Sequence, residues 1–134
     1  MTLQADLTGV VEPGRGLGAR RMADSDLLDQ LQEMAGFPIV PGTLNVRLPG
    51  PMKRPPTMRY LAAEDIDPGF EAATGQAGFF FAPVLIADRY RGMAMQAVEP
   101  GYPDDQVELL CEVHLRQTLG LTDGDHVVFS MLGV

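Results

Sequence analysis

Cysteine and histidine are scarce in this 134-residue sequence, which contains one cysteine and two histidines. Cys111 stands in the apolar run VELLCEV, so no disulfide can form within the chain, and a buried structural thiol is favoured over a reactive one. His114 and His126 lie far apart and have no Cys or acidic neighbours at metal-ligand spacing. The sequence also shows no convincing Ser-His-Asp ordering. These features argue against a structural zinc site and against a hydrolase with a serine or cysteine nucleophile.

Long apolar runs are missing as well. No run approaches the roughly 20 apolar residues that a membrane-spanning helix needs. The N-terminal MTLQADL lacks the basic and apolar regions of a signal peptide. We therefore expect a cytoplasmic protein that does not associate with membranes.

Basic residues are outnumbered by acidic ones, with 10 Lys and Arg against 18 Asp and Glu and a net charge of −8. Binding to nucleic acids depends on a surplus of Lys and Arg that contact phosphates. The composition therefore argues against a nucleic-acid-binding protein. It leaves open a single nucleotide that is held by a local basic patch and a metal ion.

The length fits one compact domain, residues 1–134, because domains cluster around roughly 100 to 150 residues. Hydrophobic residues make up 46% of the chain and charged residues 21%, so disorder is not expected over most of the length. The 15 Gly and 11 Pro punctuate short periodic segments. This pattern predicts a mainly β structure with one main helix (an α+β fold), and six or so strands suggest a small closed or nearly closed barrel.

One clear helical pattern begins at Asp24 or Ser25, either of which can cap a helix, and ends at Gly36. Pro83 interrupts an apolar run and predicts a bulge or an edge position in that strand. A helical turn ending at Gly120 precedes the last strand. Strands are predicted at 7–11, at 43–48, on both sides of a hairpin within 77–98, at 107–113 and at 126–132.

The loop EPGRGLGARR has glycine at every second position from Gly14 to Gly18. Small residues allow backbone N–H groups to approach phosphate oxygens, and Arg15, Arg20 and Arg21 lie within or beside the loop. The spacing matches neither the P-loop nor the dinucleotide fingerprint. A phosphate-binding loop and an ordinary glycine-rich turn both remain open on this pattern alone.

The stretch PGTLNV places a Pro-Gly turn directly before a predicted strand. Thr43 and Asn45 are two positions apart, so their side chains share one face of that strand. Their neutral oxygens are suitable ligands for a hard cation such as Mg²⁺. The alternative is that Thr is a common strand residue and Asn a common residue at strand ends.

Glu108 is the acidic residue with the most unusual setting, because its neighbours Val107, Leu109 and Leu110 are apolar. Its side chain either alternates out to solvent or reaches a ligand cavity. The pattern alone leaves both interpretations open.

Taken in order, these pieces resemble the archaeal CTP-dependent riboflavin kinases. The resemblance runs through GVVEPGRGLGARR, the helix, GFPIVPGTLNVRL and VELLCEVHLRQTLGLTDGDHVVF, and covers nearly the whole chain. PGTLNV is specific when it occurs together with LR, a short apolar helix and DGDxV. The resemblance implies a small six-stranded cradle-loop β-barrel.

Carried over residue by residue, the resemblance implies a metal site, a flavin contact and a nucleotide site. Thr43 and Asn45 would bind Mg²⁺, and Glu108 would contact the flavin. The implied reaction transfers the γ-phosphoryl group of CTP to the 5′-hydroxyl of riboflavin, giving FMN and CDP. It depends on positioning and charge neutralisation, so no catalytic side chain is assigned. The nucleotide would be bound by Gly14, Arg15, Gly16, Leu17, Gly18, Ala19, Val113, His114, Leu115 and Arg116.

Several positions depart from the family pattern. Pro100 stands where the family usually has a threonine that contacts the flavin phosphate, and we assign this position to the flavin end of the site. His114 replaces a basic residue, and Leu17 and Ala19 stand where the best-matching pattern has Glu and Arg. The nucleotide and metal half therefore matches the family more closely than the acceptor half.

Other functions remain open from the sequence. The same barrel could be a non-catalytic module that binds a nucleotide or a flavin, or a kinase of a different small alcohol. A DNA-binding regulatory barrel is a third class, which the acidic charge disfavours. The sequence does not decide the oligomeric state, the preference for CTP over other nucleotides, or whether residues 51–57 form a lid.

Overall fold

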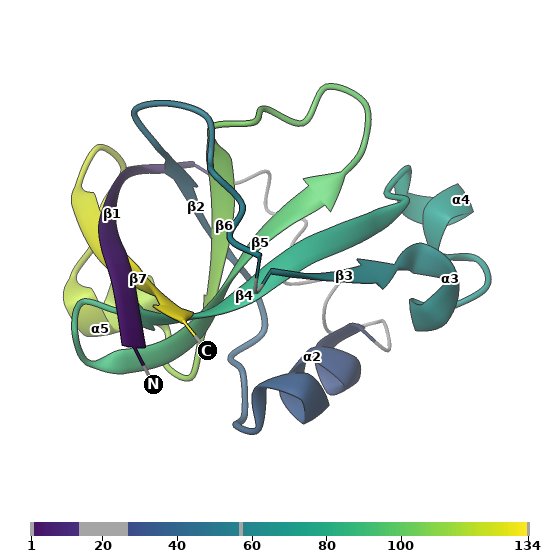
Figure 1. Ribbon diagram of the computed structural model, residues 1–134, viewed down its shortest axis with the longest axis horizontal. Coiled ribbons are helices and arrows are strands. Elements are labelled where there is room, and N and C mark those ends of the chain that lie inside the picture. Colours follow the sequence, from purple (N-terminus) through teal and green to yellow (C-terminus); the bar gives the residue numbers. More distant parts are fainter. Residues whose placement is uncertain (1, 14–26, 57, 134) are drawn as a thin grey trace.

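An antiparallel sheet of seven strands dominates the part of the chain that the structure describes, residues 2–13, 27–56 and 58–133 of a computed structural model (Figure 1). The strands are ordered β3-β4-β5-β6-β2-β1-β7, and a further pairing of β4 with β7 closes six of them into a barrel. The expected mainly β, six-stranded barrel is confirmed, with β3 as an extra strand. The bounds are β1 (Thr2–Glu12), β2 (Leu44–Arg47), β3 (Arg59–Ala62), β4 (Gly78–Ile86), β5 (Tyr90–Val98), β6 (Gln106–Cys111) and β7 (His126–Gly133).

Strand β4 closes the barrel because it changes partner along its length. Residues 78–81 pair with β3 and residues 84–86 pair with β7, while β5 pairs along the whole strand. Pro83 lies between the two partial pairings and has a register partner in neither β3 nor β7. Proline is tolerated where a strand locally forms an edge. The predicted edge position is therefore confirmed.

The predicted hairpin is formed by β4 and β5. Its turn places Ala87 and Asp88 in the left-handed region, with φ of 54° and 55°. Arg89 N donates to Ile86 O at 3.1 Å across the turn. Two consecutive left-handed residues give the turn the twist that paired strands require. Register then fixes the hairpin from Gly78↔Val98 to Ile86↔Tyr90.

The helices α2 (Leu27–Ala35) and α5 (Leu115–Leu119) correspond to the two predicted helical segments. Gly36 (φ 81°) ends α2, and Gly120 (φ 64°) ends α5, as the sequence predicted. The predicted start of the first helix at Asp24 or Ser25 lies outside the described residues. The first strand begins earlier than predicted, at Thr2.

Three short elements between residues 58 and 76 were not predicted. They are β3, α3 (Ala63–Ile66) and α4 (Phe70–Thr74). Each is too short to produce a clear periodic pattern. Together they bring Phe70 to the ring of Phe79, with centroids 5.9 Å apart in an edge-on arrangement.

Two apolar clusters fill the fold because β4, β5 and β6 bury side chains on both faces. The barrel cluster contains Val46, Val84, Ile86, Val107 and Phe129 among others, each at most 1% exposed. The second group, which we call the outer cluster, joins α2, α3 and α4 to β3, β4 and β5, and Figure 1 shows these helices outside the barrel. Among the described residues, no helix is both long and apolar enough to cross a membrane.

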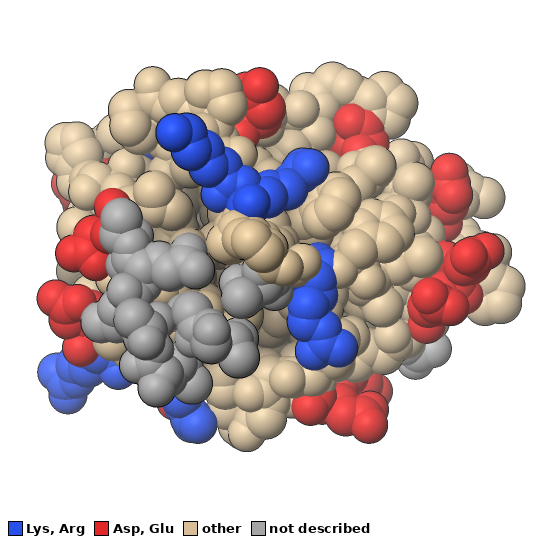
Figure 2. Space-filling view, in the orientation of Figure 1, with Lys and Arg blue, Asp and Glu red and all other residues tan. Residues whose placement is uncertain are grey.

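Charged side chains are unevenly distributed on the face drawn in Figure 2, where some Lys and Arg side chains lie toward the middle, others lie at the lower left edge, and most Asp and Glu lie nearer the rim. Exposed Lys53, Arg54 and Arg59 belong to β3 and to the connection before it, which cross this face in Figure 1. The Arg54 guanidinium lies 3.9 Å from the centroid of the Phe80 ring, and its Nε donates to Gln96 Oε1 at 3.1 Å. The basic connection is thus attached to the barrel surface by defined contacts.

Candidate functional site

A cleft of about 540 Å³ is lined by polar residues of the barrel and by apolar residues of the outer cluster. Four of the residues that the sequence analysis assigned separately, Thr43, Asn45, Pro100 and Glu108, lie along it. The stretch Val113–Arg116 lines the same cleft. Strand pairing therefore brings together segments that are far apart in the sequence.

Three polar side chains form a row across neighbouring strands. Asn45 on β2 is in register with Glu12 on β1 and with Glu108 on β6. Directly paired residues of antiparallel strands project from the same face. Thr43 lies two residues before Asn45, and its Oγ1 donates to Glu108 Oε1 at 3.2 Å. The predicted shared face of Thr43 and Asn45 is thus the face that borders the cleft.

Asn45 carries an unsatisfied acceptor. Its Oδ1 is buried and has no hydrogen-bond partner in the described part of the chain. A buried carbonyl oxygen without a donor is costly, at about 1–3 kcal/mol. Beside the Thr43 hydroxyl, this oxygen fits the requirement of a hard cation for oxygen ligands. In the described ranges, no group of three or more His, Cys, Asp or Glu residues is arranged to hold a metal.

Glu108 is held by two hydroxyl groups. Tyr102 Oη donates to Glu108 Oε2 at 3.0 Å, and Thr43 donates to the other carboxylate oxygen. Burial, followed by the negative charge of Glu108, raises the pKa of Tyr102 well above its usual value, so the phenol keeps its proton and donates. Of the two interpretations left open by the sequence, the cavity is the one observed. Tyr102 was missed, because its position in the turn PGYPDD shows no pattern that points to Glu108.

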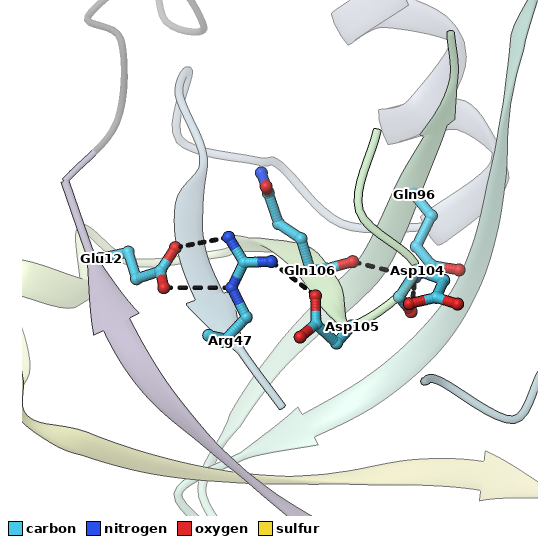
Figure 3. Close-up of polar contacts among 6 residues, drawn as sticks. All are labelled: Glu12, Arg47, Gln96, Asp104, Asp105 and Gln106. Carbon is cyan, nitrogen blue, oxygen red and sulfur yellow. Dashed lines mark hydrogen bonds and ion pairs between the residues drawn. The ribbon is translucent and has the colours of Figure 1, made fainter. Parts of the chain in front are cut away.

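An ion-pair network fixes the rim of the cleft (Figure 3). The Arg47 guanidinium binds both carboxylate oxygens of Glu12, with Nε–Oε1 at 3.0 Å and Nη2–Oε2 at 3.1 Å, and its Nη1 donates to Asp105. Hydrogen bonds to Glu12 and then to Asp105 raise the pKa of Arg47, which remains charged. The network links β1, β2 and the turn before β6, and so holds Glu12 in its place in the row.

Gln96 anchors the same turn from the other side. Its Nε2 donates to Asp104 O at 3.2 Å and to Gln106 O at 2.9 Å, and its Oε1 accepts from Arg54. Figure 3 shows Gln96 reaching the turn from β5. Since this turn follows the loop with Tyr102, these bonds restrict how far that loop can move.

The segment before α5 forms another part of the lining. His114 caps α5, because its Nδ1 accepts from Gln117 N at 3.3 Å. Arg116 Nη2 donates to Glu12 O at 3.2 Å and to Asp123 Oδ1 at 2.8 Å, so its side chain is directed toward β1. The sequence-predicted positions Gly14–Ala19 lie outside the described residues. Pro13, directly before them, lines the cleft.

Cys111 is a buried free thiol, as predicted. Its Sγ donates to Arg91 O at 3.3 Å. Burial is the main cause that raises the pKa of this thiol. A thiol with a raised pKa is a poor nucleophile, which agrees with a structural role.

Comparison with known proteins points to one family. The family model CTP-dep_RFKase, whose description reads "Domain of unknown function DUF120", matches residues 11–131. The chain is similar to the riboflavin kinase of Methanococcoides burtonii (33% identical, covering 92% of this chain and 56% of the relative). It is also similar to the riboflavin kinases of Methanospirillum hungatei JF-1 (34%, 93% and 57%) and Pyrobaculum arsenaticum (31%, 94% and 60%). The chain thus spans a little over half the length of these curated relatives.

Proposed function

Because the chain belongs to the CTP-dependent riboflavin kinase family, we propose that it transfers the γ-phosphoryl group of CTP to the 5′-hydroxyl of riboflavin, giving FMN and CDP, with Mg²⁺ as cofactor. The observation that carries this proposal is the row of Glu12, Asn45 and Glu108 beside Thr43, all lining one cleft. The row places candidate metal ligands next to a carboxylate that can bind a hydroxylated acceptor.

The donor end of the cleft would be built by three segments. Thr43 and Asn45 would hold Mg²⁺, which supplies a positive charge to the phosphate oxygens when it is bound. The loop Gly14–Ala19 would surround the phosphates, and Val113–Arg116 would contact the nucleoside. The ion pair with Arg47 keeps the Glu12 carboxylate beside β2. There its negative charge would help to keep a bound cation in place.

Glu108 would hold the hydroxyls of the acceptor's ribityl chain. Its two oxygens are already oriented by Tyr102 and Thr43, so a ligand meets a carboxylate in a fixed position. In the transfer, a bond forms between the 5′-oxygen and the γ-phosphorus as the bond to the β-γ bridging oxygen breaks. CDP leaves with that oxygen, and the proton of the 5′-hydroxyl is released to solvent. Positioning of the two reactants supplies most of the acceleration in reactions of this kind.

The acceptor end departs from the family at Pro100, which lines the cleft as an exposed residue without a hydroxyl. Tyr102, two residues later, presents a hydroxyl to Glu108 in the same loop. We infer that this loop still serves the flavin end and that the substitution changes how the flavin phosphate is contacted rather than where the flavin binds.

The direct test is FMN formation. Purified protein is incubated with Mg²⁺ and riboflavin, and with CTP or ATP in turn, and FMN is separated by chromatography and detected by fluorescence. FMN with CTP and none with ATP is expected. Failure to form FMN with either nucleotide, alongside measurable CTP binding, would contradict the kinase and favour a binding module or a different acceptor.

Variants of the row test the metal assignment. Thr43→Val and Asn45→Ala should each reduce Mg²⁺-dependent FMN formation. Thr8→Val is the matched control, because Thr8 is an exposed threonine on β1 that does not line the cleft. Unchanged Mg²⁺ dependence in both cleft variants would show that the ion is held elsewhere.

A further inference from the structure

The apolar part of the cleft is built by the outer cluster. Leu27 of α2, Phe70 of α4, Phe79 of β4 and Met95 of β5 line it, and all four are at most 5% exposed. Apolar walls of this kind suit a fused aromatic ring system, which gains binding free energy by burial. On the proposed function, this part of the cleft would accept the ring of the flavin.

One neutral polar side chain lies among these walls. Gln76 stands between α4 and β4, lines the cleft, and is only 9% exposed. Its backbone is fixed, because Gln76 N donates to Thr74 Oγ1 at 3.1 Å, and Thr74 Oγ1 itself donates to Phe70 O at 2.8 Å. The carboxamide makes no hydrogen bond within the part of the chain that the structure describes.

A second glutamine, Gln96, differs from Gln76 in the hydrogen bonds of its side-chain amide. Gln96 is 2% exposed and has both ends of its amide satisfied, by Arg54 at the oxygen and by two backbone carbonyls at the nitrogen. Buried polar groups are almost always hydrogen-bonded in folded proteins. Gln96 thus uses its amide to support the surrounding loop, whereas the Gln76 carboxamide borders the cleft and is open to a ligand there.

We propose that Gln76 determines the specificity of the acceptor site by hydrogen-bonding the polar edge of the ring. A carboxamide carries one acceptor and one donor group side by side. The pyrimidine part of the flavin ring has an imide edge, in which an N–H donor lies between two carbonyl acceptors. Gln76 Oε1 would accept from that N–H, and Nε2 would donate to an adjacent carbonyl. This inference rests on the proposed function, since it identifies what the same site selects.

The test compares riboflavin with 3-methylriboflavin, in which the imide N–H is replaced by N–CH₃. Dissociation constants are measured by quenching of flavin fluorescence, without nucleotide, for the wild-type protein and Gln76→Met. The wild type is expected to bind riboflavin roughly 10- to 100-fold more tightly than the methylated analogue, the cost of leaving a buried polar group unpaired. Gln76→Met should bring that ratio close to one while leaving CTP binding unchanged.

Gln117→Met is the matched control, because Gln117 is exposed on α5 and does not line the cleft. If Gln76→Met does not fold, Gln76→Leu is used instead, and the same ratio close to one is expected. Equal binding of the two flavins by the wild type overturns the inference without any variant. A ratio that survives both substitutions also overturns it.

The outcomes separate this inference from the proposed function. If the wild type forms FMN but shows no loss of discrimination in the Gln76 variants, the kinase stands and the role of Gln76 is wrong. If the wild type binds neither flavin, the acceptor itself is wrong and the inference fails with it.

Discussion

Among single residues, Asn45 shows the clearest conflict between stability and ligand binding. Its buried Oδ1 has no partner in the described ranges. Asn45→Leu keeps the approximate size and removes that oxygen. We expect the ligand-free variant to be as stable as the wild type or more stable by about 1 kcal/mol. Mg²⁺-dependent FMN formation should fall by at least about 10- to 100-fold, the loss seen when even an indirect partner of a metal ligand is removed.

These two effects are measured separately, by urea unfolding in EDTA and by activity over a titration of Mg²⁺. Unchanged stability together with reduced activity would indicate a role in binding the ion. If Asn45 had only a structural role, its substitution would reduce stability and activity together. A marked loss of stability in EDTA would contradict the interpretation of Asn45 as a residue kept for its ligand.

Tyr102 makes a second residue-level prediction. The raised pKa keeps its phenol protonated at neutral pH, so the hydroxyl always donates to Glu108. Tyr102→Phe should reduce the free energy of unfolding by about 1–2 kcal/mol, because a hydrogen bond to a charged acceptor is lost, and should weaken riboflavin binding. Tyr60→Phe is the control, since Tyr60 is 49% exposed and its hydroxyl donates to the Ala77 carbonyl in an exposed hydrogen bond. Equal effects of the two substitutions would contradict a special role for Tyr102.

Among the elements, the packing of β5 on β6 depends on the absence of a side chain at Gly92. A Cβ there would lie 2.3 Å from Leu110 O and 2.6 Å from Ile86 Cδ1. Gly92→Ala is therefore expected to destabilise the protein by about 3 kcal/mol. Gly50→Ala serves as the control, because its added Cβ would meet nothing within 4 Å. Urea unfolding compares the two, and equal midpoints would show that β5 can shift without cost.

A carboxylate joins the same two strands directly beside Gly92, which is in register with Cys111. Glu112 accepts from Arg91 N at 2.7 Å and from Arg91 Nη2 at 3.0 Å, and the hydrogen bonds from the Arg91 side chain are the main cause that lowers the pKa of Glu112. A carboxylate with a lowered pKa stabilises the folded state above its ordinary pKa of 4.5 and loses that contribution as the pH falls through the lowered value.

Glu112→Gln should therefore be less stable than the wild type at pH 7 by no more than about 1 kcal/mol, as for other partly exposed ion pairs. The difference should shrink as the pH falls below 4.5. Urea unfolding from pH 7 to pH 3 measures it. A difference that stays constant over that range would show that the charge of Glu112 is not the cause.

For the whole molecule, the net charge predicts that the protein does not bind DNA. A chain with net charge −8 has too few Lys and Arg for general contacts to phosphate backbones. We expect no binding to a pool of duplex DNA at low salt, where electrostatic attraction is strongest, in a gel-shift titration. Binding that weakens steeply with added salt would contradict this and would direct attention to the basic residues Lys53, Arg54 and Arg59.

Much of this architecture could be predicted from local sequence, because local sequence limits local backbone geometry. The alternation around PGTLNV determined which face of β2 is buried, and Gly36 and Gly120 marked the ends of two helices. Pro83 indicated a local strand edge, and the apolar surroundings of Cys111 indicated a buried thiol. The short elements between residues 58 and 76 were not predictable in this way, since four or five residues do not complete a recognisable period.

The tertiary structure decided which side chains meet. No sequence pattern places Tyr102 against Glu108 or puts Glu12 in register with Asn45. Nor does the sequence show that the side-chain amide of Gln96 is hydrogen-bonded within the described part of the protein while that of Gln76 is not. These relations depend on the register between strands that are distant in the sequence and on the closure of β4 against β7. Residue types in the sequence thus determined which chemistry was available, while long-range pairing decided which groups lie in one cleft, because contact between distant segments depends on the closed sheet as a whole.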